Sequence, residues 1–238
     1  MALQKLSFSR RAPRLFPNVM NTQTGQPLLE FVSCPHPEGQ HRMAYWRWGD
    51  VNARRLVVCA HGLTRQGRDF DRLAQALVSQ SPQALQIICP DVVGRGRSDW
   101  LADPMGYQLQ AYVADMVTLL ARLDAVTVHW LGTSMGGLIG LGLAALPGSP
   151  VSRLVLNDVG PTIEPASLQR IGQYLGQPAH WATEDEAADA LWAISTGFGP
   201  HSRAQWLALT RPQLKADGDG FTLRCDPAIA LPFRLLTP

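Results

Sequence analysis

Short apolar runs alternate along the chain with stretches that have helical periodicity. Three runs show little alternation and end near turn-forming residues, as buried parallel strands do; they are residues 56–60, 85–89 and 126–131. Apolar positions recur at the spacing of an amphipathic helix in residues 70–78 and 109–123. A fourth apolar run, residues 154–156, follows a helix expected just after Ser134. This order of strand, helix and strand predicts an α/β fold whose open, mostly parallel sheet carries helices on both faces.

The pattern differs on either side of this repeat. Residues 28–32 and 43–48 are predicted to form an antiparallel pair at the sheet edge, so the sheet is expected to be mixed. After Asp158 no convincing buried strand appears, and helix starts take over. Two of these starts have the spacing of a capping box, in Thr183 with Glu186 and in Ser202 with Gln205.

These patterns divide the chain into four parts. Residues 25–160 are predicted to form the α/β core, and residues 161–225 a helical lid. Residues 226–238 hold three prolines and are predicted to begin a return to the core. Residues 1–24 form a basic tail, interpreted as frayed, with a targeting arm as the alternative. Its charges are Lys5, Arg10, Arg11 and Arg14.

Composition narrows the classes of partner. The 238 residues are 46% hydrophobic and 17% charged, with a formal net charge of +2, which argues for a globular core and against disorder. The near-neutral balance argues against nucleic acid, because phosphate binding needs a basic stripe. No apolar run approaches the ~20 residues needed to cross a bilayer, so no membrane partner is predicted. The four cysteines are widely spaced, without zinc-ligand spacing, which favours a reduced, cytoplasmic setting and no metal.

The strongest chemical signal is the sequence Gly132-Thr133-Ser134-Met135-Gly136, which lies between a predicted strand and a predicted helix. This is the G-x-S-x-G pattern in the strand-turn-helix setting that it requires. A nucleophile on so sharp a turn needs small neighbours, and Gly132 and Gly136 meet that demand. We therefore predict that Ser134 is a nucleophile and that the Met135 amide helps to hold an oxyanion at the helix start.

A second oxyanion donor is expected from the loop after residues 56–60, which reads His61-Gly62-Leu63-Thr64-Arg65. The Leu63 amide is the predicted donor. His61 precedes the nucleophile in the chain and is predicted to orient this loop by a hydrogen bond rather than to act as the catalytic base.

Three motifs each follow a predicted strand: HGLTR at residues 61–65, DVVGRGRSD at 91–99 and GTSMGG at 132–137. With these motifs in this order, the chain resembles the α/β-hydrolase superfamily. It is similar to the serine-nucleophile, lidded branch that contains esterases and acyltransferases. The resemblance implies a triad in the order serine, acid, histidine, and hydrolysis of a small-molecule acyl substrate through an acyl-enzyme without a cofactor. Asp158 stands where some members carry the acid and is kept as a candidate, with a turn-capping aspartate as the alternative.

The chain departs from this family after the lid. Members continue with two further strands and place the base histidine on a loop after them, whereas the only histidines after Ser134 here are His180 and His201. We therefore expect the terminal strands of the fold to be missing, the chain to be truncated, and activity to be in doubt. Three functions stay open: a serine hydrolase acting on an ester, an acyltransferase using the same serine, and a non-catalytic binding protein or remnant. Self-association across an exposed sheet edge is a further expectation.

Overall fold

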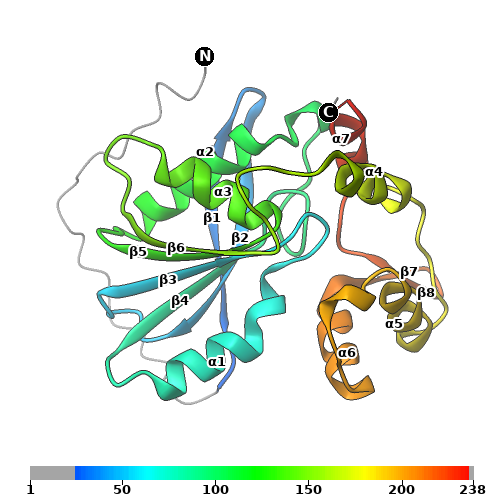
Figure 1. The fold of residues 1–238 in the computed structure, drawn as a ribbon, viewed down its shortest axis with the longest axis horizontal. Helices are drawn as coiled ribbons and strands as arrows, with labels where there is room; N and C mark the ends of the chain where they lie inside the picture. Colours follow the sequence, from blue (N-terminus) through cyan, green and yellow to red (C-terminus); the bar gives the residue numbers. More distant parts are fainter. Residues whose placement is uncertain (1–24, 236–238) are drawn as a thin grey trace.

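The computed structural model describes residues 25–235 and contains a six-stranded sheet (Figure 1). The strands are ordered β1-β2-β4-β3-β5-β6. Their bounds are β1 Leu28–His36, β2 Gly39–Gly49, β3 Arg55–Ala60, β4 Leu85–Pro90, β5 Val128–Thr133 and β6 Val151–Asn157. β1, β2 and β4 pair antiparallel, whereas β4, β3, β5 and β6 pair parallel. The prediction of a mixed, mostly parallel sheet with an antiparallel pair at one edge is confirmed.

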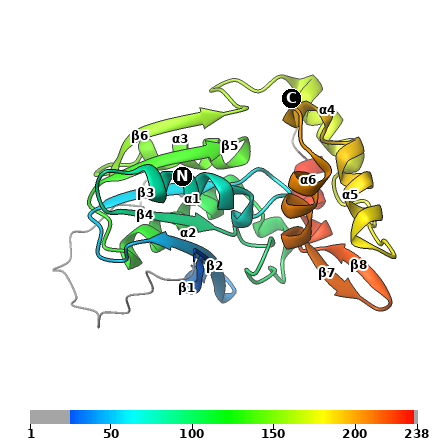
Figure 2. The ribbon, with the colours of Figure 1, turned by 90° about the horizontal axis from the view of Figure 1, so that it is seen from below.

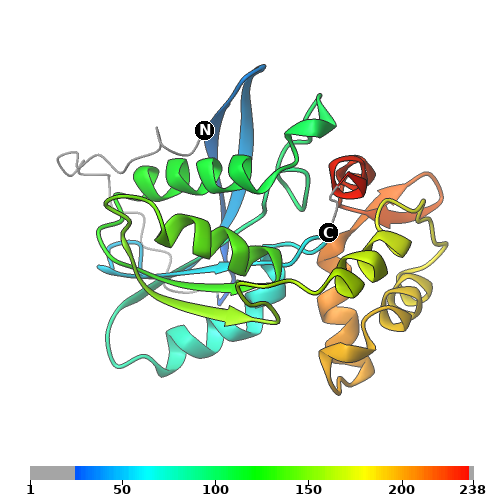
Figure 3. The same ribbon diagram turned by 45° about the horizontal axis from the view of Figure 1, so that its top comes forward.

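Helices cover both faces of this sheet, as Figures 1 and 3 show. Helix α1 (Asp71–Gln80) packs on one face, where Phe70 and Ala74 meet Ile87 and Cys89. Helices α2 (Leu109–Arg122) and α3 (Met135–Ala144) cover the other face, and their apolar side chains join the larger core cluster around Trp130. Each helix buries its apolar stripe against the strands, which is the packing that the 3.6-residue periodicity predicts.

Residues 161–225, called the helical segment below, lie beyond the carboxyl ends of the parallel strands (Figure 2). The segment contains α4 (Pro165–Tyr174), α5 (Glu184–Ala193) and α6 (Arg203–Thr210). Ser202 forms a complete capping box with Gln205, as predicted. At the other predicted box the Thr183 side chain accepts from the Glu186 amide, but the Glu186 carboxylate accepts from the Ala182 amide. A small cluster of Ala188, Leu191 and Trp206 holds α5 and α6 together.

No buried strand was predicted after Asp158, but the structure contains a short, half-exposed hairpin there. Strands β7 (Leu214–Asp217) and β8 (Gly220–Leu223) form an antiparallel hairpin within the helical segment. Each strand has four residues and only its first residue is fully buried, so neither shows the long apolar run from which a strand can be recognised. The turn depends on Gly218, whose φ of +59° favours glycine.

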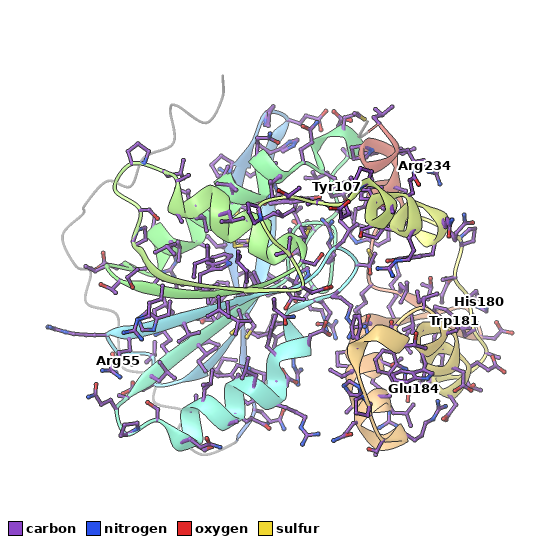
Figure 4. All side chains as sticks on the ribbon, viewed as in Figure 1. Arg55, Tyr107, His180, Trp181, Glu184 and Arg234 are labelled. Carbon is purple, nitrogen blue, oxygen red and sulfur yellow. The ribbon has the colours of Figure 1, made fainter. Side chains whose placement is uncertain are left out.

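The residues after β8 pin the helical segment to the core. The Asp226 amide donates to the Gly94 carbonyl (2.8 Å), and the Tyr107 hydroxyl donates to the Asp226 carboxylate (2.6 Å). Helix α7 (Ala230–Arg234) then packs beside α4, and Leu175, Ile229 and Ala230 join the main core cluster. Figure 4 shows Tyr107 at this junction. The predicted return to the core at residue 226 therefore coincides with a set of anchoring contacts.

Strand β6 forms one edge of the sheet in the described part of the chain, and β1 forms the other. The β6 side chains are largely uncovered, and Val155 is 54% exposed. Edge-to-edge association through β6 stays a prediction. No helix within residues 25–235 is both long and apolar enough to cross a membrane. The predicted basic tail, residues 1–24, lies outside the described residues.

Candidate active site

Ser134 occupies a strained turn between β5 and α3. Its φ of +50° and ψ of −116° are unusual for a residue with a side chain, and they place it at the N-cap of α3. The Ser134 amide donates to the Asn157 carbonyl (2.9 Å), and the Ser134 carbonyl accepts from the Gly137 amide (2.8 Å), so the turn is fixed from both sides. The hydroxyl itself makes no hydrogen bond to another described residue and is half-buried.

The two flanking glycines are required by close backbone approach. A Cβ on Gly132 would lie 2.3 Å from the Gly136 carbonyl group, and a Cβ on Gly136 would lie 2.1 Å from the Ala60 carbonyl oxygen. Both distances are shorter than any side chain tolerates, so α3 can start this close to β3 and β5 only because both positions lack a side chain. The predicted demand for small residues beside Ser134 has this physical origin.

The loop after β3 lies directly beside the turn. A Cβ built on Gly62 would lie 3.8 Å from the Ser134 Cβ. The neighbouring Leu63 amide and the Met135 amide, at the first residue of α3, donate no hydrogen bond to other described residues. Two free N–H groups are thus available on the two loops that meet at Ser134, as an oxyanion site needs.

His61 fixes the backbone of this loop. Its Nδ1 donates to the Gly62 carbonyl (2.7 Å), while its Nε2 accepts from the Val92 amide (2.9 Å). Both ring nitrogens are therefore used by the backbone, and burial lowers the His61 pKa to about 3, so the ring is neutral. These two bonds are of the kind predicted for a loop-orienting His61, and they leave no ring nitrogen free to serve Ser134 as a base.

Arg95 is a supporting residue that the sequence analysis did not single out. Its guanidinium is fully buried and donates to the Leu63 carbonyl (2.9 Å), the Val93 carbonyl (2.7 Å) and the Tyr112 hydroxyl (3.0 Å). It also contacts the Met135 sulfur at 3.6 Å. Arg95 therefore connects the loop that carries the Leu63 amide with Met135, the first residue of α3. The only available signal was its place in the motif DVVGRGRSD.

The candidate acid lies at the same edge of the sheet. Thr133 and Asn157 are paired in the β5–β6 register, so Asp158 leaves the end of β6 next to the strand that leads to Ser134. Asp158 is exposed and has a φ of +55°, and it makes no hydrogen bond to another described residue. This position fits both the predicted triad acid and the alternative of a turn-capping aspartate.

Comparison with known proteins gives the family. A family model described as the alpha/beta hydrolase fold matches residues 55–215. The 3-hydroxybutyrate-oligomer hydrolase of Cupriavidus necator is 52% identical over 219 residues, covering 90% of this chain and 73% of that protein. The chain belongs to the α/β-hydrolase family.

Two solved structures agree with this assignment. A Rickettsia typhi protein superposes with a TM-score of 0.80 at 30% identity, covering 86% of this chain and 74% of that one. An alpha/beta hydrolase from Novosphingobium aromaticivorans gives a TM-score of 0.79 at 32% identity, covering 90% and 75%. The predicted resemblance and fold class are confirmed.

In this α/β hydrolase, the two histidines that follow Ser134 in the chain bond backbone carbonyls of the helical segment. His180 sits on the outer side of the helical segment (Figure 4), where its Nε2 lies 3.1 Å from the Asp217 carbonyl. His201 bonds the Gly199 carbonyl through Nδ1 (3.0 Å) and packs edge-on against Trp192 and Trp206. His36, His41, His61 and His129 complete the six histidines of the sequence, and none of them hydrogen-bonds Ser134 in the described residues.

Two polar side chains, Asp91 and Ser98, hold the loop after β4 in this hydrolase. From the sequence, both residues could be predicted only as turn formers. The Asp91 carboxylate accepts from the Gly67 amide (2.7 Å), the Arg97 amide (2.8 Å) and the Trp46 indole (3.2 Å). Burial raises the Asp91 pKa to about 6. Ser98 donates to the Asp91 carbonyl and accepts from the Ala44 amide (2.8 Å). This loop carries Arg95 and is therefore part of the support beneath the site.

A separate buried cluster in this hydrolase brings together potential metal ligands. One ligand atom each from Cys34, His41 and Asp115 lies within 4.8 Å of the others. His41 Nε2 and Asp115 Oδ2 are already 2.9 Å apart, and burial raises the Cys34 thiol pKa above its ordinary value. The thiol is therefore protonated, and the cluster joins β1, β2 and α2 as a polar contact in the core.

Proposed function

We propose that the protein is a serine hydrolase that cleaves an ester of a small acyl substrate through an acyl-enzyme on Ser134. The observation that carries this proposal is the strained Ser134 turn with two free amides beside it, at Leu63 and Met135. The relative from Cupriavidus necator, named a 3-hydroxybutyrate-oligomer hydrolase, supports an ester of a short hydroxy acid as the substrate class.

The chemistry follows from this geometry. Ser134 Oγ attacks the ester carbonyl carbon, and the carbonyl oxygen becomes an oxyanion that the Leu63 and Met135 amides hold. The serine proton passes to a base, the alcohol leaves with a proton, and the acyl group stays on Ser134. Water then attacks the acyl-enzyme, releasing the acid and restoring the hydroxyl. Arg95 acts as a positioning residue, since it bonds the Leu63 carbonyl and contacts Met135.

The helical segment is proposed as the lid of this site. It stands at the carboxyl ends of the parallel strands, where ligands bind in open α/β sheets (Figure 2). Arg65, two residues after Leu63, places its guanidinium 5.6 Å from the Phe198 ring centroid and 6.0 Å from that of Trp206. The oxyanion loop and the lid are thus in direct contact. A movement of the lid would therefore shift the loop that carries the Leu63 amide.

One component of the triad is not supplied by the described residues. A serine hydroxyl is a weak nucleophile unless a base takes its proton, and none of the six histidines hydrogen-bonds Ser134 in the described residues. The second candidate function, a binding protein with the hydrolase fold, is favoured by this observation alone. The acyltransferase alternative uses the same serine and differs only in the acceptor, which is an alcohol or thiol in place of water.

Chemical rescue separates hydrolase from binding protein. Hydrolysis of p-nitrophenyl butyrate would be followed with and without added imidazole, which supplies the missing ring as a free base. Ser134→Ala, under the same imidazole concentrations, is the blank for uncatalysed hydrolysis. We expect imidazole to raise the rate of the unaltered chain above this blank, and Asp158→Asn to reduce the gain if Asp158 orients the imidazole. Equal rates for the chain and Ser134→Ala at every imidazole concentration would favour the binding protein.

A further inference from the structure

A cavity of about 250 Å³ lies between the core and the helical segment, and arginines dominate its wall. From the core come Trp46 on β2, the short 3-10 helix Gly67–Phe70 with the residue before it, and the loop after β4. The helical segment contributes the 3-10 helix Arg211–Gln213 and the residue after β8. The polar side chains that line it are Gln66, Arg68, Arg97, Arg211 and Arg224.

Two of these arginines have carboxylate partners and two do not. Arg68 pairs with Asp71 (2.5 Å) and stacks on the Trp46 ring, and Arg211 pairs with Glu184 (2.8 Å). Within residues 25–235, no carboxylate lies within 4.0 Å of the guanidinium of Arg97 or Arg224.

Arg224 is held in place although its surroundings disfavour its charge. Its Nε donates to the Leu214 carbonyl (2.8 Å). Burial lowers the Arg224 pKa, and the neighbouring Arg97 lowers it further, while the Asp91 carboxylate acts in the opposite direction. Asp91 is itself engaged by two amides and the Trp46 indole. Two like charges thus share the cavity wall without a counter-ion of their own, and a bound anion would relieve their repulsion.

A second observation points to a ligand at the same place. Gln66 is 3% exposed and lines the cavity. Its side-chain oxygen accepts from the Arg68 amide (3.2 Å), but its side-chain nitrogen is buried without any hydrogen-bond partner. Buried donors are ordinarily satisfied, so this amide is an unused donor beside two unpaired arginines.

We propose that this arginine pocket binds the free carboxylate of an ester substrate whose reacting carbonyl lies at Ser134. The inference rests on the function proposed above and deepens it, because it selects esters that carry a carboxylate over neutral esters. Arg97 and Arg224 provide the charge and Gln66 the additional donor. A planar carboxylate suits guanidinium groups, which present paired N–H donors.

The connection between pocket and nucleophile runs through two short stretches of chain. Gln66 is three residues after Leu63, a span of at most about 11 Å when extended. Gly96, which also lines the pocket, follows Arg95, and Arg95 bonds the Leu63 carbonyl and contacts Met135. The pocket is therefore built on the loops that carry and support the oxyanion amides.

Calorimetric titration of the full-length Ser134→Ala chain tests the pocket without turnover. The probes are monomethyl glutarate, an ester with one carboxylate, and dimethyl glutarate, its neutral counterpart, with inorganic phosphate as a third ligand. We expect monomethyl glutarate to bind at least about tenfold more tightly than dimethyl glutarate, and its affinity to fall with added salt. Adding Arg97→Gln should weaken it by about tenfold, whereas Arg72→Gln, an exposed arginine outside the pocket, should not.

Each other outcome has a defined meaning. Equal affinity for the two glutarate esters, or affinity unchanged by Arg97→Gln, would overturn the proposal. Tighter binding of phosphate than of monomethyl glutarate would overturn the assignment to a carboxylate. The titration uses the Ser134→Ala chain, so it does not depend on catalysis by Ser134. If the pocket proposal fails, the titration shows no selective binding; if the proposed Ser134 mechanism fails, the hydrolysis assay shows no imidazole rescue.

Discussion

The turn around Ser134 and the helical segment opposite it are held by contrasting means. At the turn, backbone atoms approach so closely that Gly132 and Gly136 admit no side chain, and a fully buried arginine bonds the surrounding carbonyls. The helical segment has a small apolar cluster and ion pairs such as that of Arg203 with Asp185, whose side chains are 44% and 69% exposed. Exposed pairs of this kind contribute little to stability.

This difference indicates that the Ser134 turn and the helical segment have different roles. The Ser134 turn tolerates almost no change because its backbone packs against neighbouring strands without room for a further side chain, which suits a preorganised site. The helical segment can shift or vary with a smaller loss, which suits a region that selects the substrate. Substitutions at the Ser134 turn should therefore cost more unfolding free energy than substitutions in the helical segment.

Arg95→Met should have the greatest effect. It removes the shared donor of the Leu63 and Val93 carbonyls and the Tyr112 hydroxyl, leaving buried polar groups without partners. We expect a loss of about 4 kcal/mol in the free energy of unfolding, measured by urea denaturation. The control is Arg97→Met, whose side chain is exposed and makes no hydrogen bond among described residues. Similar losses for both would show that burial of Arg95 is not what fixes the turn.

Gly136→Ala should cost about 3 kcal/mol of unfolding free energy, because its methyl group would meet the Ala60 carbonyl oxygen at 2.1 Å. The matched control in the helical segment is Gly197→Ala, where an added Cβ meets nothing within 4 Å. We expect that variant to unfold within about 0.5 kcal/mol of the unaltered chain. A small loss at Gly136 would contradict the close packing of the turn.

His61→Gln should change the pH dependence of stability. The folded-state pKa of His61, about 3, lies below the ordinary 6.5, so its contribution is present above pH 6.5 and is lost as pH falls toward 3. Between pH 7.5 and pH 5, the unaltered chain should lose about 2 kcal/mol more than His61→Gln. Urea denaturation of both chains at pH 7.5 and pH 5 measures this difference. An identical dependence in His61→Gln would refute the buried neutral ring.

Ser202→Ala, in the helical segment, should have the smallest effect. It removes the side chain that accepts from the Gln205 amide at the start of α6, a capping contact of about 1 kcal/mol. Thermal unfolding followed by circular dichroism measures the change, with Ser167→Ala in α4 as a control that removes no side-chain hydrogen bond among described residues. If Ser202→Ala were as damaging as Gly136→Ala, the contrast between the two regions would be wrong.

Local signals explain how far the sequence could be interpreted. Strands and helices of the core follow from apolar periodicity, and the Ser134 turn follows from small residues at fixed offsets, because both are encoded by neighbours in the chain. The caps at Thr183 and Ser202 are local for the same reason. Hairpin β7–β8 was missed because its strands are short and half-exposed.

Features that join distant segments could not be predicted in this way. Arg95 reads as an ordinary charged residue of a loop, and only the fold shows that it is buried beside Leu63 and Met135. The arginine pocket unites Gln66 and Arg97 with Arg224, which are far apart in sequence. Contacts among core loops decide the place of Arg95, and docking of the helical segment on the core decides the pocket; no periodicity encodes either.

Ser134 is the proposed nucleophile, and the imidazole-dependent hydrolysis of p-nitrophenyl butyrate tests this role most directly. The rate of the unaltered chain minus that of Ser134→Ala, at the same imidazole concentration, isolates the chemistry of the serine hydroxyl. We predict that this difference is positive and rises with imidazole. A difference of zero at all concentrations would contradict a serine hydrolase and leave a hydrolase fold that binds without turnover.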